Sequence, residues 1–366
     1  MPVPADRIAS PAGAGAEAQA GAAGSPRGTG GTNAIGTPIP GETAAAPGTV
    51  GDAGAKRVDL VLEGGGVKGI GLVGAISVLE ENGYSFPRVA GTSAGAIVGA
   101  LVAAGMDSAG LNEVMSSLDY TRFRDEAPLD HVPLVGKGLS LWRKLGIYTG
   151  DYLHGWIRRQ LEELHVHTFG DLYDPDPGSS LPVGEQYRLV VMTSDISRGR
   201  LLRLPWDYQS DGIDANTQAV ADAVRASMSI PFFYRPVTLE IPHAQPSTLV
   251  DGGMLSNFPV AVFDRTDGQP PRWPTIGIKL SARQKPDQVE HVVEGDVRFA
   301  MAMLGTMQSW NDQMHLDDPR VVARTIFVDT LGVNATDFEI SRATQQKLYR
   351  NGRTAAEQLL TRLSTS

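Results

Sequence analysis

The sequence contains no cysteine, and this absence excludes several kinds of chemistry at once. Disulfides, thiolate metal sites and a cysteine nucleophile all require that side chain. Basic residues are also in the minority, because 32 Lys and Arg face 41 Asp and Glu, for a formal charge of −9. Nucleic-acid binding needs a basic surface, so we expect no nucleic-acid partner. No metal-ligand spacing is visible either, and we expect no metal or other cofactor.

Residues 1–55 lack Phe, Tyr and Trp and are rich in Ala, Gly and Pro. Such a stretch cannot bury enough apolar surface to offset the entropy lost on ordering, so we predict a disordered tail. One folded domain over residues 56–366 is expected to follow it. The first residues also lack the continuous apolar core of a secretory signal. The compartment stays open, either the cytoplasm or export without a classical signal peptide.

Residues 89–106 carry no charge, and Gly91, Gly95 and Gly99 repeat within them at four-residue spacing. This pattern resembles a membrane span with a helix-packing motif. However, the stretch is dominated by Gly and Ala, which insert weakly, and it includes Thr92 and Ser93. A buried helix after a tight turn explains the same residues, and we favour that interpretation.

Hydrophobic periodicity predicts strand, turn and helix twice in succession. An apolar run at 57–63 and a helical pattern at 67–82 are followed by a short strand at 88–91 and a helix at 94–104. This order is typical of a parallel sheet covered by helices. Further strands are predicted at 187–195, 201–205, 247–253, 275–280 and 324–330, and further helices at 215–229, 288–315 and 341–363. We therefore predict a three-layer α/β/α fold with a mainly parallel central sheet.

A glycine-rich loop follows the first predicted strand. Gly64, Gly66 and Gly69 fit the G-x-G-x-x-G spacing of a dinucleotide-binding turn. A dinucleotide site would also need an acidic residue at the end of the next strand, to hold the ribose. That strand ends in Gly91-Thr92-Ser93, with no carboxylate. A nucleotide-binding function is weakened by this but remains an alternative.

The second turn carries the G-x-S-x-G pattern, with Ser93 between Gly91 and Gly95. Glycines at these positions let a nucleophilic serine occupy a sharp, strained turn above the sheet. Strand ends of a βαβ unit meet at one edge, so the N–H groups of Gly65 and Gly66 are expected to face Ser93. Together with the N–H of Ala94, they would stabilise the oxyanion of an acyl-transfer reaction.

A serine nucleophile needs a base, and the best candidate is Asp251. It ends a predicted strand and is followed by Gly252 and Gly253, which allow a tight turn. A histidine base would be usual for this kind of serine. We treat His291 and His315 as the weaker alternatives, because both lie in apparently helical sequence.

The three motifs in this order resemble those of the patatin-like phospholipase family. The segment at 222–237 and the pair Asn257 and Pro259 resemble the family as well, and the resemblance covers roughly residues 57–330. It implies a Ser93–Asp251 dyad without histidine. It also implies an oxyanion hole from the loop that begins at Gly64, including Gly65 and Gly66. Lys68 stands where most members have arginine, so it keeps the charge but not the planar fork.

The resemblance implies hydrolysis of carboxylic esters in glycerophospholipids or related lipids through an acyl-enzyme. Residues 139–164 combine an apolar helical face with basic neighbours, a pattern that suits peripheral contact with a membrane surface. Packing of that face on the core is the simpler interpretation, and lipid contact is the alternative. A further alternative is a patatin fold that is non-catalytic or is activated by a partner, which the sequence does not identify.

Overall fold

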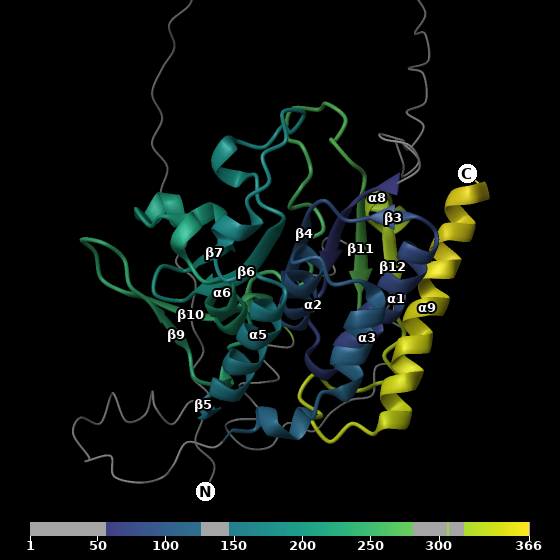
Figure 1. Ribbon diagram of the computed structural model, residues 1–366, viewed down its shortest axis with the longest axis horizontal. Helices are drawn as coiled ribbons and strands as arrows, with labels where there is room; N and C mark the ends of the chain where they lie inside the picture. Colours follow the sequence, from purple (N-terminus) through teal and green to yellow (C-terminus); the bar gives the residue numbers. More distant parts are fainter. Residues whose placement is uncertain (1–55, 126–145, 281–305, 307–317, 366) are drawn as a thin grey trace, which may run out of the picture. The chain divides into compact units, whose positions relative to one another are not determined.

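An eight-stranded sheet forms the core of the described part of the chain (Figure 1). The computed structural model describes residues 56–125, 146–280, 306 and 318–365, all within the unit that spans residues 44–366. The predicted tail and the predicted helix at 288–315, apart from residue 306, lie outside these residues. The strands are β2 (Asp59–Leu62), β4 (Val89–Thr92), β6 (Leu189–Asp195), β7 (Arg200–Leu204), β9 (Val237–Leu239), β10 (Ser247–Asp251), β11 (Thr275–Lys279) and β12 (Thr325–Phe327).

The sheet is parallel through its first half and antiparallel at its far end. Its order is β12-β11-β2-β4-β6-β10-β9, and all neighbours from β12 to β6 are parallel. Both β7 and β10 run antiparallel to β6, and β9 runs antiparallel to β10. Two small parallel pairs complete the strands, β1 (Lys56–Arg57) with β3 (Tyr84–Ser85) and β5 (Gly146–Tyr148) with β8 (Phe232–Tyr234). The predicted α/β fold with a mainly parallel sheet is confirmed.

Helices flank this sheet (Figure 1). They are α1 (Ile70–Glu81), α2 (Ala94–Ala103), α3 (Ser108–Ser117), α5 (Asp151–Glu163), α6 (Val220–Ser227), α8 (Pro319–Ala323) and α9 (Arg342–Thr365). Helix α9 packs so closely on α1 that a Cβ on Gly74 would lie 2.0 Å from the carbonyl oxygen of Tyr349. The absence of a side chain at this position therefore lets the backbones of α1 and α9 touch.

The single helix predicted at 215–229 is wrong in its first part. A short 3-10 turn at Ala215–Thr217 is separated from α6 by Gln218 and Ala219, which are extended. The N–H of Phe169 donates to the carbonyl of Gln218 at 3.0 Å, and the N–H of Val220 donates to His167 at 3.1 Å. Backbone pairing with a distant segment thus replaces the helical hydrogen bonds that local propensity favours.

The described parts of the two segments with a resemblance to membrane sequences contribute to the core. Residues 89–92 and 94–103 are β4 and α2, and both are buried throughout. No helix in the described part of the chain is long and apolar enough to cross a membrane. The apolar face of α5 is buried through Leu153, Trp156, Ile157 and Leu161. The simpler interpretation of that face, packing on the core, is therefore confirmed.

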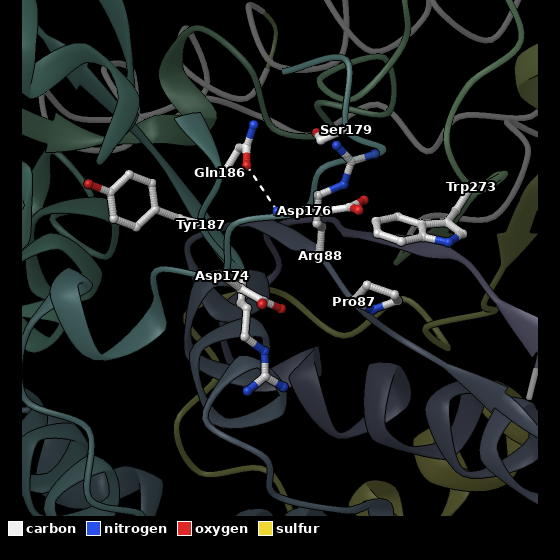
Figure 2. Close-up of a pocket in the computed structure, with 9 residues that line it drawn as sticks. Pro87, Arg88, Asp174, Asp176, Ser179, Gln186, Tyr187 and Trp273 are labelled. Carbon is white, nitrogen blue, oxygen red and sulfur yellow. Dashed lines mark hydrogen bonds between the residues drawn. The ribbon is translucent and has the colours of Figure 1, made fainter. Parts of the chain in front are cut away.

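A buried ion pair joins the amino ends of β2 and β4. Arg88 donates through Nε to Asp59 at 2.7 Å and forms a second bond through Nη2. Its guanidinium carbon lies over the rings of Phe263 and Trp273, at 4.8 and 5.2 Å from their centroids. Figure 2 shows Arg88 and Trp273 beside a small cavity of about 20 Å³. This cavity has the size of one water molecule, so it cannot accept a lipid.

Replacing Arg88 by Met should destabilise the protein most strongly above pH 6. Burial raises the pKa of Asp59 to about 6, although the hydrogen bonds and charge of Arg88 oppose this rise. Without Arg88 the ionised carboxyl has no cation, and breaking such a pair costs about 3–5 kcal/mol. The cost should shrink towards pH 4, which lies below the folded pKa of about 6, because there the folded carboxyl is protonated with or without Arg88 and no buried charge is left without a partner. Urea unfolding at both pH values measures this. Equal losses at the two would contradict it, and Asp59→Asn combined with Arg88→Met is the control.

Candidate active site

Ser93 occupies a strained turn between β4 and α2. Its φ and ψ are 53° and −122°, a conformation that costs a non-glycine residue about 1–3 kcal/mol. The flanking glycines permit this turn, since a Cβ on Gly91 would lie 2.2 Å from the carbonyl oxygen of Gly95. On Gly95 a Cβ would lie 2.3 Å from the carbonyl oxygen of Leu62. The predicted strand–serine–helix turn is therefore confirmed.

Two residues at the end of α6, Ser227 and Met228, contact this serine, and neither was predicted as a site residue. The N–H of Ser93 donates to the hydroxyl of Ser227 at 2.9 Å, and that hydroxyl donates to the carbonyl of Met192 at 2.6 Å. The Ser93 hydroxyl donates to the sulfur of Met228 at 3.3 Å. Both residues belong to the segment at 222–237 that resembles the patatin-like phospholipase family. This resemblance was the one feature of the sequence that pointed to them.

Asp251 and Ser93 lie close together because their strands, β10 and β4, are the two neighbours of β6 in the sheet. Thr92 of β4 pairs with Met192, and Asp251 of β10 pairs with Thr193, so the serine and the acid stand at the same level. The Asp251 side chain is 3% exposed and accepts the N–H of Gly253 at 2.7 Å. Burial raises its pKa to about 6, while hydrogen bonds from the Ser93 hydroxyl and the Gly253 N–H lower it. The structure thus brings together the two residues that the sequence singled out.

The glycine loop lies directly against Ser93. A Cβ on Gly64 would be 3.1 Å from the Cβ of Ser93 and 2.3 Å from Oδ1 of Asn257. The N–H of Gly64 donates to the carbonyl of Asn257 at 3.1 Å, so this group is already engaged. Within the described ranges, no acceptor is recorded for the N–H groups of Gly65, Gly66 and Ala94. The expected set of three loop donors is therefore reduced to Gly65 and Gly66, with Ala94 beside them.

The other motif residues support the close packing of the loops. Lys68 follows the loop, with its Cε 3.2 Å from the position of a Cβ on Gly65. A Cβ on Gly69 would lie 3.4 Å from the Cβ of Ala94, which keeps α2 near the turn that precedes α1. On Gly252 a Cβ would meet the carbonyl oxygen of Met192 at 2.3 Å, so the turn after Asp251 can approach β6 only without a side chain.

Histidine makes no recorded contact with this pair in the described residues. His154 bonds to Asp222 at 2.7 Å, between α5 and α6. The candidates His291 and His315 lie outside the described residues.

A larger groove of about 520 Å³ runs between α5, α6 and β9, with Leu204 and Leu249 among its apolar lining residues. It reaches Ala226, which precedes the serine that holds the Ser93 backbone.

A strained serine beside a buried carboxyl, at the carboxyl edge of an α/β sheet, defines a hydrolase-like site. Residues 60–264 match the family model described as patatin-like phospholipase, and the chain belongs to this family. Membership makes the chain a lipid hydrolase in the general sense.

Several known proteins are similar to parts of this chain in sequence or in structure. The uncharacterized protein YqhO of Bacillus subtilis is 34% identical over 304 residues, which is 83% of this chain and 98% of YqhO. The lysophospholipase nte1 of Emericella nidulans is 31% identical over 208 residues, 56% of this chain but only 11% of nte1. The crystal structure of VipD from Legionella pneumophila aligns with a TM-score of 0.47 and 20% identity, covering 83% of this chain and 66% of VipD.

Replacing Ser227 by Ala should lower the free energy of unfolding by about 1–3 kcal/mol, because a buried donor and acceptor each lose their partner. The matched control is Ser194→Ala on β6, also fully buried, whose hydroxyl makes a weak bond of 3.4 Å to the Gly252 carbonyl. Chemical denaturation compares the two variants. Equal losses in the two variants would mean that the hydrogen bond to Ser93 adds nothing to the free energy of unfolding beyond the contribution of an ordinary buried serine.

Proposed function

We propose that this protein hydrolyses carboxylic ester bonds of glycerophospholipids or lysophospholipids, with Ser93 as nucleophile and Asp251 as general base. The carrying observation is the strained Ser93 hydroxyl beside a buried Asp251 carboxyl. Family membership supports a lipid as the substrate. A nucleotide-binding function has less support, because the strand after the glycine loop ends in Thr92 and Ser93 rather than in an acid.

The reaction begins when Asp251 takes the hydroxyl proton of Ser93 as Oγ attacks the ester carbonyl. The carbonyl oxygen becomes negative in the tetrahedral intermediate and accepts hydrogen bonds from the N–H groups of Gly65, Gly66 and Ala94. The positive end of α2 also faces this oxygen. Donors that are fixed before the charge develops lose no reorganisation energy, and one of them is worth about 3–4 kcal/mol in other enzymes.

Collapse of the intermediate breaks the ester C–O bond, and the departing alcohol takes the proton from Asp251. The fatty acyl group remains on Ser93. Water then attacks this acyl-enzyme, giving one proton to Asp251, and the second collapse releases the fatty acid and returns the proton to Ser93. An acid with a pKa of about 6 is ionised at neutral pH and is a stronger base than an ordinary aspartate.

Ser93→Ala and Asp251→Asn should each reduce fatty-acid release from lysophospholipid micelles by at least about 1,000-fold, because nucleophile and base act as one unit. Circular dichroism should stay unchanged. Labelling of the wild-type protein by a fluorophosphonate, mapped to Ser93 by mass spectrometry, tests the nucleophile directly.

Asp222→Asn is the matched control, since this carboxyl bonds to His154 and stands largely in solvent. It should retain full turnover. Turnover at the wild-type rate in either the Ser93 or the Asp251 variant would remove that residue from the mechanism.

The rate should rise with pH through the titration of Asp251. Because only the carboxylate accepts a proton, kcat/KM should increase across about pH 6 and level off above pH 7. A profile that is flat between pH 5 and 8 would contradict the assignment of Asp251 as base.

The same titration predicts a change in stability. The folded pKa of Asp251, about 6, exceeds its ordinary value of 3.8, so the wild type loses stability as pH rises between these values. Asp251→Asn removes this loss. The variant should be more stable than the wild type at pH 8, by about 3 kcal/mol at most, and equally stable at pH 4. Thermal unfolding at both pH values measures the difference.

A further inference from the structure

A second buried ion pair lies behind the glycine loop, outside the motifs that the sequence analysis used. Glu63 follows β2 and precedes Gly64, and its side chain is 2% exposed. It bonds to the ammonium of Lys279 at the end of β11, and it also accepts the N–H of Leu280. The carboxyl ends of two parallel strands are thereby fixed to each other at the point where the loop begins.

Asn257 connects this ion pair to the loop. Its Nδ2 lies 3.4 Å from Oε1 of Glu63 and 3.3 Å from the carbonyl oxygen of Gly64. Its own backbone carbonyl accepts the Gly64 N–H at 3.1 Å. Asn257 therefore contacts both polar groups of the Gly64 peptide region, and it does so from the segment that follows Asp251.

The ion pair also contacts Phe258 and Leu280, two residues that lie next to the contact between Asn257 and Gly64. The ammonium of Lys279 lies 5.4 Å from the centroid of the Phe258 ring, next to Asn257 in the chain. Leu280, whose N–H is held by Glu63, packs its Cδ1 2.6 Å from the position of a Cβ on Gly65. The Glu63 carboxylate thus bonds both to Leu280, which packs against Gly65, and to Asn257, which contacts Gly64.

We propose that Asn257 is a positioning residue, supported by the Glu63–Lys279 pair, which holds the N–H groups of Gly65 and Gly66 in place relative to Ser93. The network joins the loop of the predicted oxyanion donors to the loop of the predicted base, so both depend on one asparagine. This inference rests on the proposed function for its kinetic consequence, but the contacts themselves do not.

Asn257→Ala should lower kcat by about 30-fold or more and leave KM within about threefold, because the donors act on charge that exists only in the transition state. The rate of fluorophosphonate labelling should fall in parallel. Asn257→Asp keeps the shape but places an acceptor against Glu63 and the Gly64 carbonyl, so it should be at least as impaired. If the asparagine only filled space, the Asp variant would behave like the wild type.

The matched control is Asn351→Ala on α9, whose amide also bonds to one distant carbonyl, that of Asp329 at 2.8 Å. It should leave kcat unchanged. An unchanged kcat in a folded Asn257→Ala variant, or a rise in KM alone, would overturn the proposal.

Hydrogen exchange separates this proposal from the proposed function. Amide exchange in the peptide around residues 63–70 should accelerate in Asn257→Ala and not in Asn351→Ala, whether or not the protein hydrolyses the lipid tested. Unchanged exchange in that peptide would overturn the positioning role. An inactive, unlabelled wild type with accelerated exchange in the variant would instead overturn the function alone.

The ion pair is tested by comparing Lys279→Met with the double variant Glu63→Gln, Lys279→Met. The single change removes the ammonium that faces the buried Glu63 carboxylate, whereas the double change leaves two neutral groups, so the double variant should be the more stable of the two. If the single variant were as stable as the wild type, the pair would not anchor the loop.

Discussion

Close approach of peptide backbones at the carboxyl edge of the sheet is the constraint on which the site depends. Carbonyl oxygens stand within about 2.3 Å of where a side chain would begin at Gly91, Gly95 and Gly252. A methyl group at any of these positions would force the strand ends apart. Near Ser93, the N–H groups of Gly65, Gly66 and Ala94 have no acceptor within the described ranges. The glycines thus permit both the strained turn and the close packing of the loops around it.

Two buried aspartates illustrate how geometry, rather than acidity, distinguishes a site from a structural pair. Burial raises the pKa of Asp59 and of Asp251 to about 6 in both cases. Asp59 bonds to a guanidinium that contacts two aromatic rings, which suits a structural role at the amino edge. Asp251 instead accepts a peptide N–H, that of Gly253, and the Ser93 hydroxyl lowers its pKa. An unneutralised buried acid costs stability, and such a cost is typical of groups retained for chemistry.

Much of the fold could be predicted because its elements follow local patterns. The first two strand–helix units begin and end within a few residues of the predicted positions, since apolar periodicity and glycine stops coincide there. The turn at Ser93 was predictable for the same reason, because its glycines carry a steric meaning. The interruption of the helix at Gln218 and Ala219 was not, because it depends on backbone pairing with residues 167–169.

The sequence by itself determined the first two strand–helix units, the candidate serine and the candidate acid, because these depend on residue type and near neighbours. Only the tertiary structure decided which groups meet. The antiparallel direction of β10 and the pairing of Asp251 with Thr193 place the acid level with Ser93. Asn257, Ser227 and Lys279 acquire their contacts from residues more than 100 positions away, and hydrogen bonds over such separations leave no periodic trace in the chain.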